Sequence, residues 1–425
     1  MIGEKESTKA SLFWKENIMH INRNRLLETI ATSASIGRGE NGGIQRLALT
    51  AEDQQMRNQL KMWMEEEQLN VRIDDFGNMY GRRKGRDNHP AILIGSHLDT
   101  QPHGGKYDGI IGVLGALEVI RTLNEHGVVT NTPIEIVNFT NEEGARFAPP
   151  LLGSSGLTAN SNKERIYQIR DRNGTTFHDA LAEIGYIGDE KIENQLNSIF
   201  IELHIEQGPR LDQQNKSIGI VRGIEGISWL KVTVEGEMNH AGPTPMEARK
   251  DALVASSKMV LAVNELAKNV SGLKVTVGEL NVMPNVPNVI PGMVTFIIDV
   301  RHESDGHRLA AEENMREKLS AIAALMEIGV TIETLWEEPT IQFHSRIIEE
   351  ITTSTKNRKL STMEMYSGPS HDAKNMAKLC KAGMIFVPSV NGVSHNEAEF
   401  THNEDIVNGV NTLLDVTCAL SNAKT

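Results

Sequence analysis

Four short apolar segments, each followed closely by histidine or carboxylate residues, constrain the fold of this chain most. They are residues 91–94, 134–139, 199–203 and 384–387. Apolar runs of this length predict strands that are buried on both faces, as in a parallel sheet. A glycine-rich loop and an apolar helix, predicted over residues 110–123, separate the first two. This strand–helix–strand succession indicates a doubly wound α/β sheet.

A second pattern begins at about Lys216. Strands are predicted at residues 229–235, 273–282, 294–301 and 330–336, and helices at residues 247–269 and 309–328. The order β-α-β-β-α-β is typical of a ferredoxin-like α+β unit. We therefore predict a discontinuous α/β domain, residues 1–215 and 330–425, with a ferredoxin-like domain inserted at residues 216–329.

Candidate site residues follow the strand at 91–94. His97 stands just beyond its carboxyl end, where open α/β sheets place their binding sites. Imidazole is a good zinc ligand, and Asp99 is placed to hold its other ring nitrogen. Asp108 lies in the glycine-rich loop, which lets a carboxylate turn inward. Taken alone, this pattern is equally that of a turn with a solvated acid.

The other strand ends carry further candidates. Glu142 and Glu143 follow residues 134–139, and burying two adjacent carboxylates is costly unless a cation is near. One of them could bind a metal while the other stays free as a general base. His204 and His395 follow the remaining two strands. Each alone is compatible with a loop or core residue, but the recurrence predicts a site for two metal ions with one bridging carboxylate.

A second polar group lies in the predicted inserted domain and comprises His240, Asn288 and Arg301. An arginine can grip a carboxylate through a two-pronged contact. In the main domain, Gly368 and Ser370 belong to another polar segment. These segments are compatible with ordinary surface turns, but together they predict an anion pocket that faces the metals.

Charge and cysteine content exclude several kinds of partner. The chain has 43 Lys+Arg against 56 Asp+Glu, a formal net charge of −13, so it offers no basic face to nucleic acid or an anionic membrane. Two cysteines cannot form a disulfide framework. No signal peptide or apolar run of about 18 residues is apparent. We therefore expect a soluble cytoplasmic protein with no nucleic-acid or membrane partner.

Eight motifs of the chain together resemble the hydantoinase/carbamoylase family, within the clan of dinuclear-metal exopeptidases and amidohydrolases. They are SHLDT, YDGIIGVLGALEVI, NEEGARF, HIEQGP, NHAGPTPM, NVIPG, SGPSHDA and VPSVNGVSHNEAEF. The resemblance runs from about Gly95 to Asn408. It implies a two-domain enzyme whose inserted domain serves as a lid and for dimerisation. Members of the family cleave C–N bonds in N-carbamoyl amino acids, ureidopropionate or allantoate.

The resemblance also implies a metal centre with two divalent ions per subunit, zinc first and manganese, cobalt or nickel as alternatives. Glu142 would be the general base and Asp99 the partner of His97. A cis peptide between Asp108 and Gly109 is implied as well. One metal would be bound by His97, Asp108 and His204, and the other by Asp108, Glu143 and His395, with Asp108 as the bridge.

The substrate residues implied by the resemblance come from both domains. Those of the inserted domain would reach the active site of the partner subunit, so a homodimer is expected. The substrate would be a small molecule with a carboxylate and a ureido group. The residues concerned are Gln207, His240, Asn288, Arg301, Gly368 and Ser370.

The resulting functional hypothesis is the hydrolysis of N-carbamoyl-L-amino acids to the amino acid, carbon dioxide and ammonia. Allantoate amidohydrolase and β-ureidopropionase are alternatives within the family. Allantoate is less favoured because residues 223–229 lack the arginine that allantoate-cleaving relatives tend to carry there. An aminoacylase or dipeptidase of the same clan is a further alternative. A binding protein without turnover is disfavoured, since every ligand position and Glu142 carry competent residues.

Overall fold

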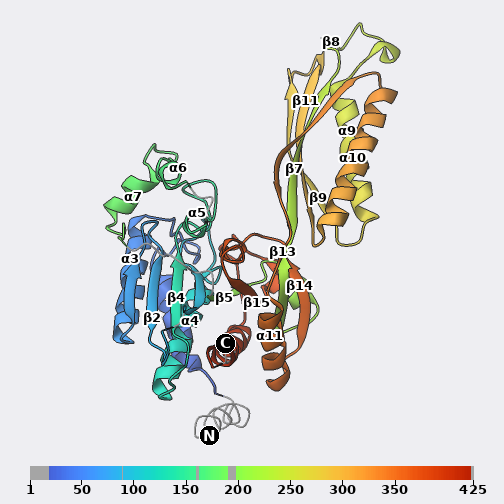
Figure 1. Cartoon of the computed structure of the whole chain (residues 1–425). Helices are drawn as coiled ribbons and strands as arrows, with labels where there is room; N and C mark the ends of the chain where they lie inside the picture. Colours follow the sequence, from blue (N-terminus) through green and yellow to red (C-terminus); the bar gives the residue numbers. More distant parts are fainter. Residues whose placement is uncertain (1–18, 89, 159–161, 190–197, 423–425) are drawn as a thin grey trace. The chain divides into compact units, whose positions relative to one another are not determined.

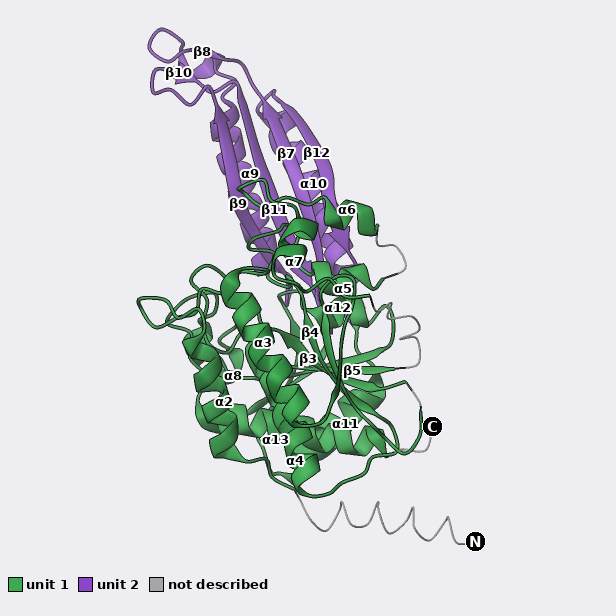
Figure 2. Cartoon of the chain, turned by 90° about the vertical axis from the view of Figure 1, so that its left-hand side faces the viewer, with its two compact units in different colours: residues 1–222, 342–425 green, residues 223–341 purple. Residues whose placement is uncertain are grey.

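The computed structural model describes residues 19–88, 90–158, 162–189 and 198–422 (Figure 1). The loose tail expected at residues 1–15 lies outside these residues. The chain divides into two compact units (Figure 2). Unit 1 comprises residues 1–222 and 342–425, and unit 2 comprises residues 223–341. Among the described helices, none is long and apolar enough to cross a membrane.

Unit 1 is built on a nine-stranded mixed sheet. Its strands are β1 (Asn70–Ile73), β2 (Met79–Arg83), β3 (Ile92–His97), β4 (Ile134–Phe139), β5 (Ile199–Ile205), β6 (Ile218–Ile224), β13 (Ile341–Gln342), β14 (Thr362–Ser367) and β15 (Lys381–Val387). The order is β1-β2-β4-β3-β5-β15-β6-β13, and β14 pairs with β6. The central strands β4, β3, β5 and β15 are parallel, whereas β2 and β6 join them antiparallel. An α/β fold was predicted, and the mixed sheet confirms it.

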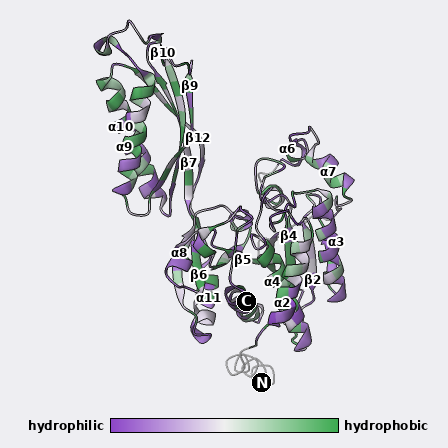
Figure 3. Cartoon of the chain, turned by 180° about the vertical axis from the view of Figure 1, so that it is seen from behind, coloured by the Kyte–Doolittle hydropathy of each residue, from purple (hydrophilic) through white to green (hydrophobic). Residues whose placement is uncertain are grey.

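The helices of unit 1 pack around this sheet. They are α2 (Arg23–Ser35), α3 (Ala51–Glu66), α4 (Ile110–Glu125), α5 (Leu152–Gly156), α6 (Lys163–Tyr167), α7 (Phe177–Glu183), α8 (Arg210–Gln213), α11 (Ser345–Asn357), α12 (Asp372–Met376) and α13 (Asn403–Ser421). Every residue of α4 from Ile110 to Leu123 is buried. This helix packs on β3, β4 and β5, and hydrophobic residues gather on it and on the central strands (Figure 3). The site-bearing strands are therefore fixed by the apolar core.

The sequence of residues 71–81 favours a single strand, but the structure forms a hairpin of β1 and β2 there. The Asp74 carboxylate accepts hydrogen bonds from the backbone N–H groups of Phe76 and Asn78, both at 2.9 Å. Gly77 takes a positive φ of 79° between the strands. An aspartate that bonds to the backbone two and four residues on favours a turn, which outweighs the extended propensity of the flanking residues.

Unit 2 has β-α-β-β-α-β order, with a four-stranded antiparallel sheet β12-β7-β11-β9. Its apolar core lies between this sheet and α9 and α10. A short ribbon of β8 and β10 extends beyond the sheet. The elements are β7 (Gly226–Glu235), β8 (Asn239–His240), α9 (Ala252–Lys268), β9 (Lys274–Met283), β10 (Val289–Ile290), β11 (Met293–His302), α10 (Asp305–Leu325) and β12 (Gly329–Glu338).

The boundaries of the inserted unit differ from the predicted residues 216–329. Strand β12 pairs with β7 from Gly329 to Glu338, so it belongs to unit 2 and not to the surrounding domain. Residues before 223 belong to unit 1, because β6 pairs with β15 there. Strand pairing, which the local pattern does not reveal, decides both boundaries.

Candidate metal centre and active site

The candidate residues of unit 1 gather at the carboxyl ends of its parallel strands. Strand β3 pairs in parallel with β4 and β5, and β15 pairs in parallel with β5, so these ends lie along one edge. His97 is the last residue of β3, and His204 is the last but one of β5. The loops after β4 and β15 carry Glu142, Glu143 and His395. The topology thus brings residues from distant parts of the chain together.

The histidines His97 and His204 are oriented by backbone carbonyl groups. Nδ1 of His97 lies 3.0 Å from the carbonyl oxygen of Asp99, and Nδ1 of His204 lies 2.9 Å from that of Ile205. A proton on each Nδ1 satisfies these contacts and leaves the Nε2 lone pair for another partner. Nε2 of His204 indeed accepts a hydrogen bond from the N–H of Gly109 at 3.1 Å. The Nδ1 contacts of both rings fit the tautomer that a metal ligand needs.

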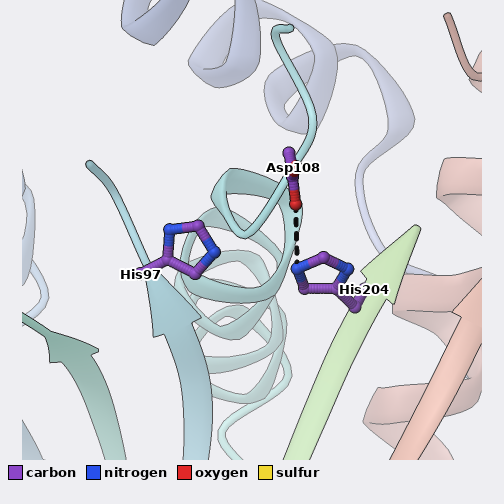
Figure 4. Close-up of side chains that lie close together, drawn as sticks. All are labelled: His97, Asp108 and His204. Atoms are coloured by element: carbon purple, nitrogen blue, oxygen red, sulfur yellow. Dashed lines mark ion pairs between the residues drawn. The ribbon is translucent and has the colours of Figure 1, made fainter. Parts of the chain in front are cut away.

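Asp108 lies between two groups of candidate ligands. Its Oδ1 is 3.1 Å from Nε2 of His204 (Figure 4), and its Oδ2 is 3.3 Å from Nε2 of His395. Within each group the ligand atoms lie within 4.8 Å of one another. The donor atoms, imidazole nitrogens and carboxylate oxygens, suit zinc and similar divalent ions. The two groups are His97, Asp108 and His204, and Asp108, Glu143 and His395.

Gly109 allows Asp108 to reach this position. Its φ is +67°, and a Cβ atom there would lie 2.2 Å from Nε2 of His97. A side chain at this position would therefore occupy the space between the ligands. The expected cis peptide between Asp108 and Gly109 is wrong, because the cis bonds among the described residues are Ala148–Pro149 and Met283–Pro284. The positive φ of Gly109 turns the chain with a trans bond.

Asp99 differs from its predicted role as a carboxylate partner of His97. Its Oδ1 is 3.9 Å from Nδ1 of His97, beyond hydrogen-bond distance, and the backbone carbonyl makes the contact instead. The carboxylate accepts the N–H of Glu142 at 3.2 Å and that of Glu143 at 3.3 Å. The turn after β3 brings the carbonyl of Asp99 back to the ring and directs its side chain to the loop after β4.

Glu142 and Glu143 lie in a strongly acidic, water-poor environment. Glu142 is 7% exposed, and its Oε2 lies 3.5 Å from Nε2 of His97. Burial, together with the charges of Asp372 and Glu143, raises the pKa of Glu142 well above its ordinary value. Burial and the charge of Asp108 raise the pKa of Glu143 to about 8. Bound cations would remove this repulsion, so the cluster fits a metal centre.

Three polar side chains hold the ligand carboxylates in place. Nε2 of Gln207 donates to Oδ2 of Asp108 at 2.8 Å, and Oγ of Ser394 lies 3.0 Å from the same oxygen. Nε2 of Gln101 donates to Oε2 of Glu143 at 2.8 Å. Gln207 was predicted to contact substrate, but Gln101 and Ser394 were not singled out. Both are near predicted ligands in the sequence, and only the folded loops show which carboxylate each contacts.

The loop after β14 lies against His204 through His371, whose ring centroid is 4.4 Å from that of His204. Nε2 of His371 contacts Oγ of Ser367 at 3.0 Å, and the predicted substrate residues Gly368 and Ser370 lie in the loop between these two residues. Glu202 also lies within ligand distance of this histidine pair. Its oxygens accept from the hydroxyl of Ser96 and the N–H of Ala373.

Comparison with known proteins identifies the family. Peptidase family M20/M25/M40 matches residues 93–418. An N-carbamoyl-L-amino-acid amidohydrolase of Rhizobium meliloti is 38% identical over 399 residues, which are 92% of this chain and 95% of that protein. The chain belongs to peptidase family M20/M25/M40. The resemblance inferred from the eight motifs is confirmed.

Two further relatives place the chain within the M20 family. Allantoate amidohydrolase of Escherichia coli strain K12 is 36% identical over 92% of this chain and 96% of its own. The crystal structure of a hydantoinase/carbamoylase family amidase from Burkholderia ambifaria matches with a TM-score of 0.91 and 37% identity. That match covers 96% of this chain and all of the other. M20 enzymes typically depend on two metal ions, and the two ligand groups agree with this.

The predicted substrate residues of unit 2 do not form one pocket. His240 pairs with Val289 in the β8–β10 ribbon, and the carbonyl of Asn288 accepts the N–H of Ala241 at 3.0 Å. Arg301 lies near the opposite end of β11, where the chain enters and leaves unit 2. The eight steps from Met293 to Arg301 span about 26 Å at about 3.3 Å per residue. His240 and Asn288 therefore lie at one end of unit 2, and Arg301 lies at the other.

The Arg301 guanidinium is held by a carboxylate on its own strand. Its Nε and Nη2 contact the two oxygens of Asp299 at 2.8 and 2.9 Å. Nε1 of Trp229 donates to Oδ2 of the same aspartate at 2.8 Å. These contacts fix one edge of the Arg301 guanidinium and give it a defined direction on the face of the sheet opposite α9 and α10. Recognition of a substrate carboxylate would require such a fixed direction.

Proposed function

We propose that this M20 enzyme hydrolyses N-carbamoyl-L-amino acids to the free amino acid, carbon dioxide and ammonia. The position of Asp108 between His204 and His395 is the observation that carries the proposal, because it supplies one bridging carboxylate for two cations. The relative from Rhizobium meliloti, named for this activity, supports it. Residues 223–229 carry no arginine, which favours this substrate class over allantoate.

A ureido carbonyl is a poor electrophile, since two nitrogens donate electrons into it. When bound, two divalent cations would withdraw electrons from that carbonyl and make water a stronger acid. His97, Asp108 and His204 would hold one of them, with Asp108 shared by the second pair of ligands, Glu143 and His395. Zinc is the proposed metal, with manganese, cobalt and nickel as alternatives; the nitrogen and oxygen donors suit all four.

Glu142 is the proposed general base. Nε2 of His97 lies 3.5 Å from its Oε2, and the carboxylate of Asp99 fixes its backbone N–H. Its Oε2 would take a proton from the attacking water and return it to the departing nitrogen. Loss of this nitrogen as the amine gives the amino acid and carbamate, which decomposes to carbon dioxide and ammonia. Asp99 thus acts by placing Glu142 and Glu143.

Substrate binding, in this proposal, involves a homodimer with a lid formed by unit 2. His240 and Asn288 would donate to the developing oxyanion in the partner's site. Arg301 would bind the substrate carboxylate in the site of its own chain, because one rigid unit cannot present both ends to one small molecule. Gln207, Gly368 and Ser370 would line the remainder in unit 1. For Arg301, the site of its own chain replaces the expectation that it reaches the partner's site. The roles of all these residues are proposals, as is a cytoplasmic location.

A panel of substrates tests the proposal. Ammonia release from N-carbamoyl-L-methionine is to be measured beside allantoate, 3-ureidopropionate, N-acetyl-L-methionine and simple dipeptides. We expect the N-carbamoyl amino acid to give the highest kcat/KM, with metal content determined on the same sample. Allantoate is the second candidate, because the Escherichia coli relative named for that substrate is 36% identical. A preference for N-acetyl-L-methionine or dipeptides would contradict the proposal.

A further inference from the structure

Glu399 is a buried carboxylate that touches the loops of two metal ligands. It lies in the segment between β15 and α13, four residues after His395, and is 4% exposed. Its Oε1 accepts the N–H of Tyr107 at 3.0 Å and the N–H of Asp108 at 3.2 Å. Its Oε2 lies 3.0 Å from the hydroxyl of Ser394, the residue before His395. One carboxylate thus joins the loops that supply Asp108 and His395.

The loop of Asp108 is shaped around this carboxylate. A Cβ atom on Gly105 would lie 1.9 Å from Oε1 of Glu399, so only glycine allows the backbone to approach this closely. Burying a carboxylate is costly unless donors surround it, and here two backbone N–H groups and one hydroxyl do so. The arrangement is specific to a carboxylate, because each of its neighbours on these loops offers a proton.

Ser394 extends the same contact to the bridging ligand. Its Oγ lies 3.0 Å from Oδ2 of Asp108 as well as 3.0 Å from Oε2 of Glu399. The hydroxyl has a single proton, so it donates to one of these oxygens at a time. It therefore links the two carboxylates, and the residue that follows it, His395, places Nε2 3.3 Å from the same Oδ2.

We propose that Glu399 is a positioning residue for the metal centre, which fixes the loop of Asp108 relative to the loop of His395. This inference rests on the proposed function. The cation of Asp108, Glu143 and His395 depends on three loops, and Glu399 joins two of them, those of Asp108 and His395. The cation of His97, Asp108 and His204 shares Asp108, but its other two ligands stand on β3 and β5, which are paired strands of the sheet. Loss of the Glu399 carboxylate should therefore weaken binding of the cation of Asp108, Glu143 and His395 more than binding of the other cation.

The test is Zn²⁺ affinity of the full-length protein, measured by competition with a chromophoric chelator. Glu399→Gln keeps the shape but places an NH₂ group against a backbone N–H or the serine hydroxyl. Because partners of metal ligands typically contribute 10–100-fold to affinity, we expect one of the two Zn²⁺ affinities, that of the site of Asp108, Glu143 and His395, to fall at least tenfold. The other site should change less than about threefold, and thermal unfolding of the metal-free protein should stay close to that of the parent.

Glu397→Gln is the matched control, two residues away on the same loop. Glu397 accepts a hydrogen bond from Asn41 at 2.7 Å and no described contact joins it to Asp108 or His395. Its Zn²⁺ affinities should stay within twofold of the parent. Ser394→Ala, a milder second variant, should weaken the same single site by a smaller factor.

Two results would overturn the inference alone. One is a Glu399→Gln protein that binds both Zn²⁺ ions within twofold of the parent. The other is equal weakening of both sites together with a lower unfolding temperature of the metal-free protein, which indicates a general structural role. A parent protein that binds fewer than two Zn²⁺ ions would overturn the proposed function and this inference with it.

Discussion

The carboxylate of Asp99 accepts the backbone N–H of Glu142, with Oδ1 and N 3.2 Å apart. Its other oxygen accepts the N–H of Glu143 at 3.3 Å. One side chain thus holds the proposed base and a proposed metal ligand in register. Because the backbone carbonyl of Asp99, and not its carboxylate, contacts His97, the side chain can be changed without removing the contact that orients the histidine.

Asp99→Asn should therefore reduce kcat more than metal affinity. The amide has one acceptor oxygen, so one of the two N–H groups loses its partner and faces an NH₂ group. A hydrogen bond to a charged group contributes about 1.5–3 kcal/mol, and we expect kcat to fall roughly 10–100-fold. Zn²⁺ stoichiometry and kcat are to be measured on the same sample. The role given to Asp99 would be contradicted if the variant lost Zn²⁺ from the site that contains His97 while the molecules that still held two Zn²⁺ ions kept the parent kcat.

Glu142→Gln and Glu143→Gln form a matched pair of adjacent substitutions with different expected outcomes. Glu142→Gln should retain two metal ions and lose several powers of ten in kcat, because an amide cannot accept the proton of water. Glu143→Gln should lose about one metal equivalent, since a ligand carboxylate is removed. The metal content and the kcat of each purified protein are to be measured. A Glu142→Gln enzyme with more than about a tenth of the parent rate would remove this residue from the mechanism.

The fold could be read from the sequence wherever the local pattern and the packing agree. Strand β4 was predicted at Ile134–Phe139 and has those bounds. All six residues are buried, and Glu135, one of the two polar residues among them, pairs with Arg72. Helix α11 was not predicted. Its sequence contains Thr352, Thr353 and Ser354, which are poor helix formers, and burial of Ile347 and Ile351 against the sheet stabilises the helix instead. The helical spacing of Ile347, Ile348 and Ile351 was present in the local sequence and could have revealed this helix.

The candidate metal ligands could be predicted because parallel strands bring their carboxyl ends to one edge. The contacts between individual atoms of the site could not be predicted. The turn between His97 and Asp99 decides whether the backbone carbonyl or the carboxylate of Asp99 contacts the ring. The sequence cannot distinguish these two groups, because they belong to one residue. The link from Glu399 to Asp108 spans 291 residues and depends on two folded loops. The separation of His240 from Arg301 follows from the length of β11, a strand that was itself predicted.

The two cysteines should be poorly reactive in the folded protein. Burial raises the pKa of Cys418 to about 12 and that of Cys380 to about 11, from an ordinary value of 9.0. At pH 8 the thiolate fraction then falls by about two powers of ten or more, and only the thiolate reacts readily. Iodoacetamide labelling followed by mass spectrometry should show slow labelling, with Cys380 ahead of buried Cys418, and no loss of activity. Equally fast labelling in native and guanidinium-unfolded protein would contradict this.

The proposed dimer makes a prediction about mixed subunits. Glu142→Gln and His240→Ala should each be nearly inactive, for different reasons. If His240 completes the partner's site, a heterodimer of the two contains one intact site, formed by Glu142 and Arg301 of one chain and His240 of the other. Random exchange of equal amounts makes half of the dimers mixed, so activity should return to about a quarter of the parent. Labelled subunits verify the exchange, and ammonia release measures the activity.

Arg301→Ala in place of His240→Ala gives the opposite expectation in the same experiment. Arg301 lies about 26 Å or more along unit 2 from the β8–β10 ribbon, so it should serve the site of its own chain. Mixed with Glu142→Gln, it leaves each site of the heterodimer with one defect, and activity should stay as low as in the two parents. Recovery with Arg301→Ala but not with His240→Ala would reverse the two assignments. No recovery in either mixture, after verified exchange, would mean that each lid acts on its own chain alone and that the ribbon residues have no part in catalysis by a partner.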